Sequence, residues 1–217
     1  MMKGGVEVIA VGDELLEGKF VESNTSFISA RLSRAGVRPR RIEILPDDKE
    51  ILSVEFRAAA ERSKYLIVTG GLGPTVDDVT KESLIEAFGL DVETRPEITA
   101  EIVKRLKRVG RKMPGSYGEQ AVVPVGSVVL PNRIGLAVGL RVDLDDFHIF
   151  LLPGVPAEMK QMFEDSVLPA IAGGPGSRTV RVRTMGMTET ELEERLKEAV
   201  PREAFDDLSI ISSPRSV

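Results

Sequence analysis

A glycine-rich segment carries the residues best suited to chemistry. It runs from Thr69 to Thr80 and reads TGGLGPTVDDVT. Glycines let a backbone approach a phosphate closely, so that main-chain N–H groups can donate to its oxygens. The spacing matches neither the G-x-G-x-x-G pattern of dinucleotide-binding folds nor the G-x-x-x-x-G-K-[ST] pattern of nucleoside triphosphatases. The segment therefore indicates a third type of anion-binding loop, with Thr69, Gly70, Gly71 and Gly73 as phosphate-binding residues.

Acidic residues accompany this loop. Asp77 and Asp78 stand just before a predicted helix and could simply cap it. Two adjacent acids beside an anion would repel the ligand unless a divalent cation lay between them, and this favours a metal site. Asp13 and Glu14 follow the first predicted strand, where they could also be ordinary acids of a first helical turn. If the first and third strands flank the point where the strand order reverses, Asp13, Glu14 and Asp78 converge.

The composition narrows the available chemistry. The chain of 217 residues contains no cysteine and one histidine, His148, which we expect to be structural. Thiolate metal sites, cysteine nucleophiles and multi-histidine zinc sites are therefore excluded, and acid–base work falls to carboxylates. A net charge of −5 and a pI near 5.2 argue against nucleic-acid binding. No stretch approaches the ~20 apolar residues of a membrane-spanning helix, and the start offers no signal peptide, so we expect a cytoplasmic protein.

Alternating strands and helices must position these residues. Short apolar runs predict strands at Val6–Val11, Val37–Leu45 and Tyr65–Thr69. Helical spacing predicts helices over residues 25–35, 80–88, 97–109 and 157–167. A further helix is expected after the candidate caps Asp47 and Asp48, with an inner face of Ile51, Val54 and Ala58. This alternation predicts a doubly wound, mostly parallel α/β sheet with helices on both faces.

The later part of the chain is expected to depart from that pattern. Residues 113–120 read as a loop, and residues 136–144 and 147–152 read as a hairpin that adds antiparallel pairing. Glycines and a proline at 173–177 mark a linker between a main domain, 1–172, and a small module, 178–217. The module is predicted to run strand, helix, strand, with a capping box at Thr188 to Glu191.

Polar residues on predicted loops are further candidates. Asn24, Gln120 and Asn132 could donate or accept hydrogen bonds, although each is also typical of a turn or cap. The turn at 153–156 could form a rigid wall of a binding site. The candidate ligand contacts outside the glycine-rich loop are Asn24, Pro153, Gly154 and Pro156.

Several motifs, in order along nearly the whole chain, resemble the amino-terminal domain of the CinA (competence/damage-inducible) family. The chain is more distantly similar to the MogA, MoaB and MoeA molybdopterin-handling proteins. The motifs that carry the resemblance are Gly12-Asp13-Glu14-Leu15-Leu16, Ser23-Asn24, residues 69–82, Gln120-Ala121, Leu130-Pro131-Asn132, residues 152–159 and Gly186. Motifs in register are a more specific signal than one glycine loop.

The resemblance implies a doubly wound α/β fold of the MoaB/MogA type, followed by a small KH-like α+β module that is incomplete here. It implies a homo-oligomer, either a dimer or a trimer, and gives Asp78 the essential acidic role with Asp13 as the matching acid of the first loop. CinA-type domains are associated with metal-dependent hydrolysis of ADP-ribose-type pyrophosphates. By that likeness, Mg²⁺, Mn²⁺ or Co²⁺ held by Asp13, Glu14 and Asp78 would bridge a diphosphate cradled by the glycines.

Two departures from the family pattern bear on function. Residues 135–139 read Gly-Leu-Ala-Val-Gly where the family commonly has Gly-Thr-Ala-Pro-Gly, which leaves substrate identity open. We find no deamidase domain after the KH-like module, so nicotinamide mononucleotide deamidation is not expected. Three functions stay open: a metal-dependent nucleotide pyrophosphatase, a molybdopterin- or nucleotide-binding module without hydrolysis, and an oligomerisation or nucleotide-sensing partner of a separate enzyme.

Overall fold

The computed structural model describes residues 5–108, 110, 112, 114–172 and 186–199. The chain forms two compact units, residues 1–178 and 179–217. The predicted linker at 173–177 and both predicted strands of the second unit lie outside the described residues. Within the second unit, α8 (Glu189–Ala199) begins at the predicted capping box. Thr188 N donates to Glu191 Oε2 at 2.7 Å, and Glu191 N donates to Thr188 Oγ1 at 3.3 Å.

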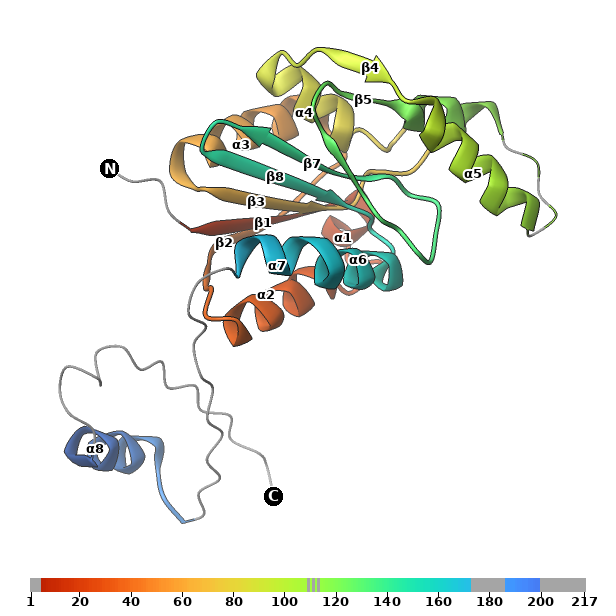
Figure 1. Cartoon of the computed structure of the whole chain (residues 1–217). Coiled ribbons are helices and arrows are strands. Elements are labelled where there is room, and N and C mark those ends of the chain that lie inside the picture. The colour runs from red at the N-terminus through yellow and green to blue at the C-terminus, as the bar shows by residue number, and fades with distance from the viewer. Residues whose placement is uncertain (1–4, 109, 111, 113, 173–185, 200–217) are drawn as a thin grey trace. The chain divides into compact units, whose positions relative to one another are not determined.

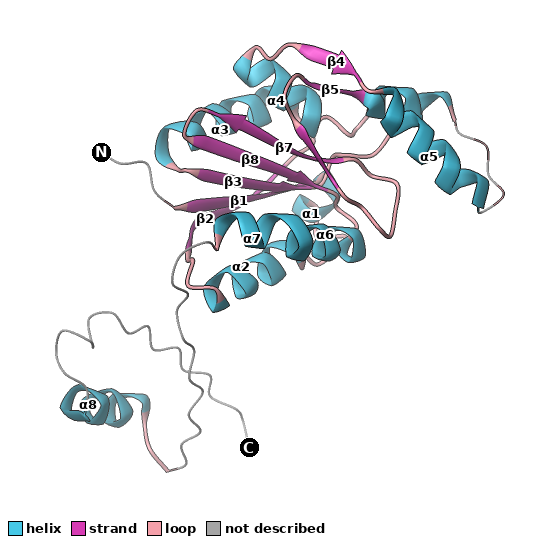
Figure 2. Cartoon of the chain, in the orientation of Figure 1, coloured by secondary structure: helices cyan, strands magenta, loops and turns pink. Residues whose placement is uncertain are grey.

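The main unit is built on a six-stranded sheet of order β2-β1-β3-β8-β7-β6. Its strands, seen in Figure 2, are β2 (Pro39–Leu45), β1 (Val6–Val11), β3 (Tyr65–Thr69), β8 (Phe147–Leu152), β7 (Gly139–Leu144) and β6 (Val128–Leu130). The first four pair in parallel, whereas β8 with β7 and β7 with β6 pair antiparallel. The predicted mostly parallel α/β fold and its hairpin are therefore confirmed.

The parallel register brings the ends of four strands to one edge. Val11 pairs with Leu45, Ala10 with Thr69, and Thr69 with Leu152. The strand order also reverses between β1 and β3, as expected. The loops that follow β1, β2, β3 and β8 therefore meet at the same edge of the sheet, which is where open α/β sheets bind ligands.

Helices cover both faces of this sheet (Figure 1). One face carries α3 (Lys49–Arg62) and α4 (Thr80–Phe88). The other carries α2 (Asn24–Arg34), α6 (Pro156–Met162) and α7 (Leu168–Ile171), the last two joined by a π-helical turn at Phe163–Val167. Alternate β1 residues enter the two cores, because successive strand side chains point to opposite faces: Ile9 and Val11 pack with α3, and Val6 and Val8 with α2.

The inner face of α3 differs from the prediction. Ile51 and Val54, expected inside, are 42% and 54% exposed. The fully buried apolar residues are Leu52, Phe56 and Ala59. Both stripes have helical spacing, and the one that contains Phe56 removes more apolar area from water, so the helix turns that stripe toward the sheet.

The chain between α4 and β6 forms elements that the sequence indicated only in part. α5 (Pro96–Arg108) was expected, whereas the short antiparallel pair β4 (Val92–Thr94) and β5 (Val122–Pro124) was not. Within residues 113–120, predicted as a loop, the described residues form a 3₁₀ helix, η1 (Gly115–Ala121). Across the described residues, we find no helix that combines the length and the apolar character needed to cross a membrane.

Candidate functional site

A cavity of about 560 Å³ lies at the carboxyl edge of the parallel strands. Ligand sites in proteins commonly measure roughly 300–1,000 Å³, so this one has the size for a nucleotide or a pterin phosphate. Its wall combines the end of β1 with α1 (Asp13–Leu16), the segment before α2, the glycine-rich loop and the turn between β8 and α6. The predicted site residues that line it are Glu14, Asn24, Thr69, Gly70, Gly71, Gly73, Asp78, Pro153, Gly154 and Pro156.

Two glycines of the loop are required by the backbone. Gly70 has a φ of 110°, and a Cβ there would lie 2.1 Å from the carbonyl oxygen of Val11. Gly71 has a φ of 60°, and a Cβ there would lie 2.3 Å from Thr80 Oγ1. Thr80 ties the loop back onto the start of α4, because its hydroxyl donates to Gly70 O at 3.0 Å and its N–H donates to Gly71 O at 3.2 Å. The loop is thus held against both β1 and the amino end of α4, the favourable end of a helix for anions.

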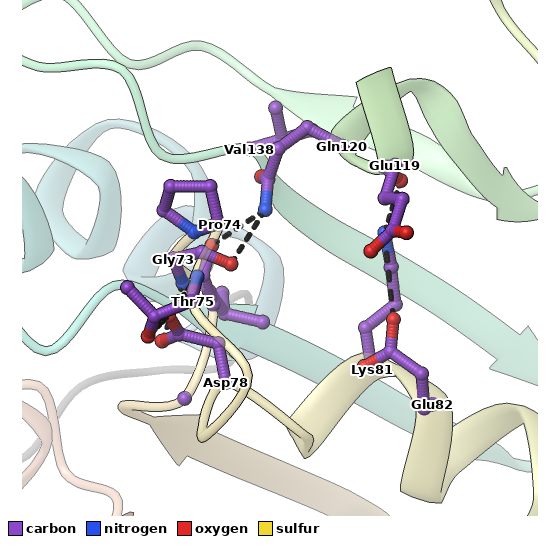
Figure 3. Close-up of a pocket in the computed structure, with 11 residues that line it drawn as sticks. Gly73, Pro74, Thr75, Asp78, Lys81, Glu82, Glu119, Gln120 and Val138 are labelled. Atoms are coloured by element: carbon purple, nitrogen blue, oxygen red, sulfur yellow. Dashed lines mark hydrogen bonds and ion pairs between the residues drawn. The ribbon is translucent and has the colours of Figure 1, made fainter. Parts of the chain in front are cut away.

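Asp78 orders this loop with both of its carboxylate oxygens (Figure 3). Oδ1 accepts from Gly73 N at 2.7 Å, and Oδ2 accepts from Thr75 N at 2.8 Å and from the Thr75 hydroxyl. Asp77 is exposed and has no such contact among the described residues. The essential role expected for Asp78 stays a prediction, and the structure adds a positioning role in the loop.

The 3₁₀ segment η1 fastens the outer side of the loop (Figure 3). Gln120 Nε2 donates to Gly73 O at 2.8 Å and to Leu72 O at 3.2 Å, and Lys81 Nζ donates to Glu119 O at 2.7 Å. Burial lowers the pKa of Lys81, although the carboxylates of Glu82 and Glu119 oppose that shift. Between these residues a hollow of about 20 Å³ has room for one water. These contacts hold the loop and the start of α4 against η1.

Asp47, which the sequence suggested only as a helix cap, joins the acids of the site. Asp13 N donates to Asp47 Oδ2 at 3.0 Å, and Asp47 N donates to Asp13 Oδ1 at 3.3 Å, which links the loops after β1 and β2. Asp47 lines the cavity, whereas Asp13 reaches it only through this partner. Burial raises the pKa of Asp47; the hydrogen bond from Asp13 opposes this shift, and the charges of Asp13, Glu14 and Asp78 add to it. Glu14 and Asp78 line the cavity and Asp13 does not, so the convergence of these three acids on one metal stays a prediction.

The acids fit a divalent cation in part. Among the described residues no group of three or more His, Asp or Glu side chains is placed to hold a metal by itself. Mg²⁺, however, is commonly bound by one or two carboxylates together with substrate phosphates. Asp13 and Asp47 lie side by side, and each uses one oxygen in the reciprocal hydrogen bonds. A cation shared between this pair and a bound phosphate suits the donor set better than the expected trio of Asp13, Glu14 and Asp78.

Asn24 joins three walls of the cavity. Its Nδ2 donates to Thr69 Oγ1 at 3.0 Å and to Gly154 O at 2.8 Å, and the Thr69 hydroxyl donates to Pro153 O at 2.9 Å. Glu22, rather than Ser23 or Asn24, caps α2, since its Oε1 accepts from Asn24 N at 2.7 Å. Asn24 and Thr69 are both buried, so their hydrogen bonds position α2 and the β8–α6 turn around the cavity.

The segment that departs from the CinA pattern lies beside the cavity. Ala137 lines it, whereas Leu136 and Val138 pack against the core that contains α3 and α4. Asn132, a further candidate, turns the preceding loop instead, because its Oδ1 accepts from Ile134 N at 3.1 Å and Gly135 N at 2.9 Å. The side chains that replace the hydroxyl and the proline therefore contribute to packing.

This arrangement defines a class: an α/β domain with a ligand-sized cavity at the point where the strand order of a mostly parallel sheet reverses. Residues 7–173 match the family model described as "Probable molybdopterin binding domain", and the chain belongs to that family. The resemblance to CinA and to MoaB and MogA proteins is therefore confirmed.

Relatives extend over most of this chain. It is 37% identical over 198 residues to a CinA-like protein of Citrifermentans bemidjiense, a match that covers 90% of this chain and 48% of the relative. It is 38% identical over 205 residues to a protein of Pyrobaculum arsenaticum, covering 92% of this chain and 77% of the relative. The chain thus spans about half the length of the CinA-like relative.

Solved structures agree with the fold. The protein CinA of unknown function from Thermoplasma acidophilum superposes with a TM-score of 0.70 at 31% identity, covering 77% of this chain and 97% of that one. The molybdopterin biosynthesis enzyme MoaB of Thermus thermophilus matches with a TM-score of 0.52 at 22% identity, covering 80% of this chain and 99% of that one. The second likeness shows the fold alone.

Proposed function

We propose that the cavity binds a nucleotide diphosphate such as ADP-ribose and, with a divalent cation, hydrolyses its diphosphate to AMP and ribose 5-phosphate. The observation that carries the proposal is the pair of Asp13 and Asp47, whose reciprocal hydrogen bonds join two acidic loops at the cavity wall that Asp47 lines. A cluster of acids of one sign is unfavourable until a cation offsets it, and a diphosphate ligand brings such a cation with it.

Each part of the site has a role in this reaction. The glycine-rich loop and the start of α4 face the phosphates with main-chain dipoles. Asp13 and Asp47 would hold Mg²⁺, Mn²⁺ or Co²⁺, which offsets the diphosphate charge and polarises its phosphorus–oxygen bonds. The attacking water passes its proton to a carboxylate of the site as the bond to the bridging oxygen breaks. Asp78 positions the loop, and Glu14 adds to the negative charge that attracts the cation.

The test is incubation of the protein with ADP-ribose, NAD, FAD and ADP-glucose in the presence of Mg²⁺, Mn²⁺ or Co²⁺, with the products identified by mass spectrometry. We expect one substrate to release a nucleoside monophosphate, and Asp47→Asn and Asp13→Asn to lower the rate by roughly 100-fold each. Asp146→Asn is the matched control, because Asp146 is an exposed acid of the β7–β8 hairpin. Absence of any monophosphate with every metal would exclude hydrolysis.

A binding module without hydrolysis is the second candidate. It is favoured by Asp78, whose two oxygens are used within the loop, and by the lack of a three-acid metal cluster among the described residues. The ligand in this case would be molybdopterin or a nucleotide. It predicts a rise in melting temperature with molybdopterin, which binding to the folded state alone produces, and recovery of the ligand unchanged.

We also expect this protein to act as a homo-oligomer, a dimer or a trimer. Light scattering during size-exclusion chromatography measures its mass directly. A monomer at micromolar concentration would contradict this expectation.

A further inference from the structure

Phe20 stands apart from the other phenylalanines of the described residues. The chain has eight phenylalanines, and of those described all but Phe20 are buried or half-buried. Phe20 is 67% exposed, and its neighbour Val21 is 92% exposed. A single exposed apolar side chain is ordinary, so the place of Phe20 decides whether it has a role.

That place is the wall of the cavity. Phe20 and Val21 line it, and Phe20 is the one aromatic side chain among the described lining residues. Backbone anchors flank the pair, because Lys19 N donates to Glu14 O at 3.0 Å and Glu22 caps α2 through Thr25 N at 2.9 Å. The anchored backbone presents an aromatic ring and a branched apolar side chain to the same cavity that contains the glycine-rich loop.

The cavity wall is therefore of two kinds. The glycine-rich loop together with Glu14, Asp47 and Asp78 forms a polar part. Phe20, Val21 and Val155, which is 54% exposed, form an apolar part. A ligand that is only a phosphate or a sugar phosphate would leave the apolar part in contact with water. A ligand with a flat, weakly polar ring at one end and phosphate at the other would cover both parts.

We propose that Phe20 stacks on a planar heteroaromatic ring of the ligand, such as a purine base or a pterin, while the phosphate lies at the glycine-rich loop. The inference rests on the proposed binding of a phosphate-bearing ligand and adds the chemical class of its other end. Ring stacking on an aromatic side chain strengthens binding roughly tenfold and tolerates different rings, because every base has a π-face. Val21 and Val155 supply apolar contact at the ring edge.

The test compares a ring-bearing with a ring-free ligand by isothermal titration calorimetry in the presence of Mg²⁺. The α,β-methylene analogue of ADP-ribose, which cannot be hydrolysed at its bridge, carries the ring, and methylenediphosphonate does not. The variants are Phe20→Ala, Phe20→Tyr, which keeps a ring, and Ile134→Ala as a control. Ile134 is 60% exposed and is not among the cavity-lining residues.

We expect Phe20→Ala to weaken binding of the ADP-ribose analogue roughly tenfold and to leave methylenediphosphonate unchanged. Phe20→Tyr and Ile134→Ala should bind both probes as the unmodified protein does. Neopterin monophosphate and AMP, titrated in parallel, distinguish the two sources of the ring, since the preferred ring loses more affinity in Phe20→Ala.

Three results would overturn the inference, and they separate it from the proposed function. Equal affinity of the unmodified protein for the ring-bearing and ring-free probes would leave the phosphate site standing and remove the ring contact. Equal weakening of both probes by Phe20→Ala would assign Phe20 a structural role. Lower oligomer mass in Phe20→Ala with unchanged affinity would make this surface a subunit interface.

A separate outcome concerns the proposed function. Failure of the unmodified protein to bind any probe would refute the proposed function itself, and the ring contact with it.

Discussion

Two carboxylates lie at opposite ends of the parallel strands, and their charged neighbours differ in sign. Glu7, near the start of β1, is 4% exposed and accepts from Arg62 Nε at 3.1 Å, Arg62 Nη2 at 2.8 Å and Ser63 Oγ at 2.6 Å. Burial alone would raise its pKa, but the hydrogen bonds from Arg62 and Ser63 outweigh it, so the pKa of Glu7 lies below the ordinary 4.5. This is a buried charge that the fold has fully paired.

Asp47, at the other end, has other acids as its charged neighbours. Burial raises its pKa, and Asp13, Glu14 and Asp78 raise it further against the hydrogen bond from Asp13. The same fold that pairs Glu7 with hydrogen-bond donors leaves Asp47 among negative charges. A bound cation would change the charge around Asp47. The comparison separates a carboxylate that stabilises the fold from one that is available for chemistry.

The largest expected change in stability concerns Glu7, near the amino end of β1. Arg62→Ala leaves Glu7 buried with Ser63 as its remaining side-chain partner, so we expect the free energy of unfolding to fall by about 3 kcal/mol. Urea unfolding followed by circular dichroism measures this change. Arg57→Ala is the matched control, because Arg57 lies on the same helix and makes one long contact, 3.5 Å, to Ala87 O. Equal losses in both variants would contradict the pairing argument.

A smaller effect is expected from Asp78 at the carboxyl end. Asp78→Ala removes the acceptor for Gly73 N and Thr75 N, so the loop should lose about 1–2 kcal/mol of stability. Asp77→Ala, one residue earlier and exposed, should stay within about 0.5 kcal/mol of the unmodified protein. Hydrogen exchange of the Gly73 and Thr75 amides would locate the loss in the loop. Unchanged protection of both amides would show that Asp78 does not order the loop.

The sequence predicted much of the fold because its strongest signals are local. The observed bounds of β1, β3 and α4 agree with the prediction, since each apolar run is closed by glycine or by a polar loop. The phase of α3 was wrong, because Ile51 and Val54 form an apolar stripe as regular as the one through Leu52 and Phe56. Only the sheet that the helix packs against decides between two such stripes.

Local sequence patterns were also insufficient to assign the residues of the site. Asp47 and Asp48 were both read as caps, yet only Asp48 caps α3, with its side chain accepting from Ile51 N at 2.9 Å. Asp47 contacts Asp13, 34 positions earlier, because β2 pairs with β1 and both strands end at one edge. A signal was present: an acid after the second strand of a parallel pair lies beside acids after the first. Phe20 left no such signal, since its exposure depends on packing.

The smallest effect on stability is expected at Asp47. Asp47→Asn keeps an oxygen that can accept from Asp13 N and removes one of the clustered charges, so stability at neutral pH should rise by roughly 0.5 kcal/mol. This gain should accompany the loss of turnover expected for the same variant. A loss of stability as large as that of Arg62→Ala would show that Asp47 stabilises the fold as Glu7 does. The proposed difference between the two carboxylates would then be wrong.

The pH dependence of these stabilities should have opposite signs at the two ends. The pKa of Glu7 is lower in the folded protein than its ordinary 4.5, so its contribution is complete above that pH and is lost as the pH falls through the folded value. The pKa of Asp47 is higher than its ordinary 3.8, so the folded state holds that proton more tightly and loses stability as the pH rises from there through the folded value.

Unfolding of the unmodified protein, Glu7→Gln and Asp47→Asn between about pH 3 and 7 measures the contribution of each carboxylate, as the difference between each variant and the unmodified protein. The advantage of the unmodified protein over Glu7→Gln should shrink toward acid, and the advantage of Asp47→Asn over the unmodified protein should vanish there. Parallel curves for the two variants would mean that both carboxylates are equally well paired, and Asp47 would then lose its claim to the chemistry of the site.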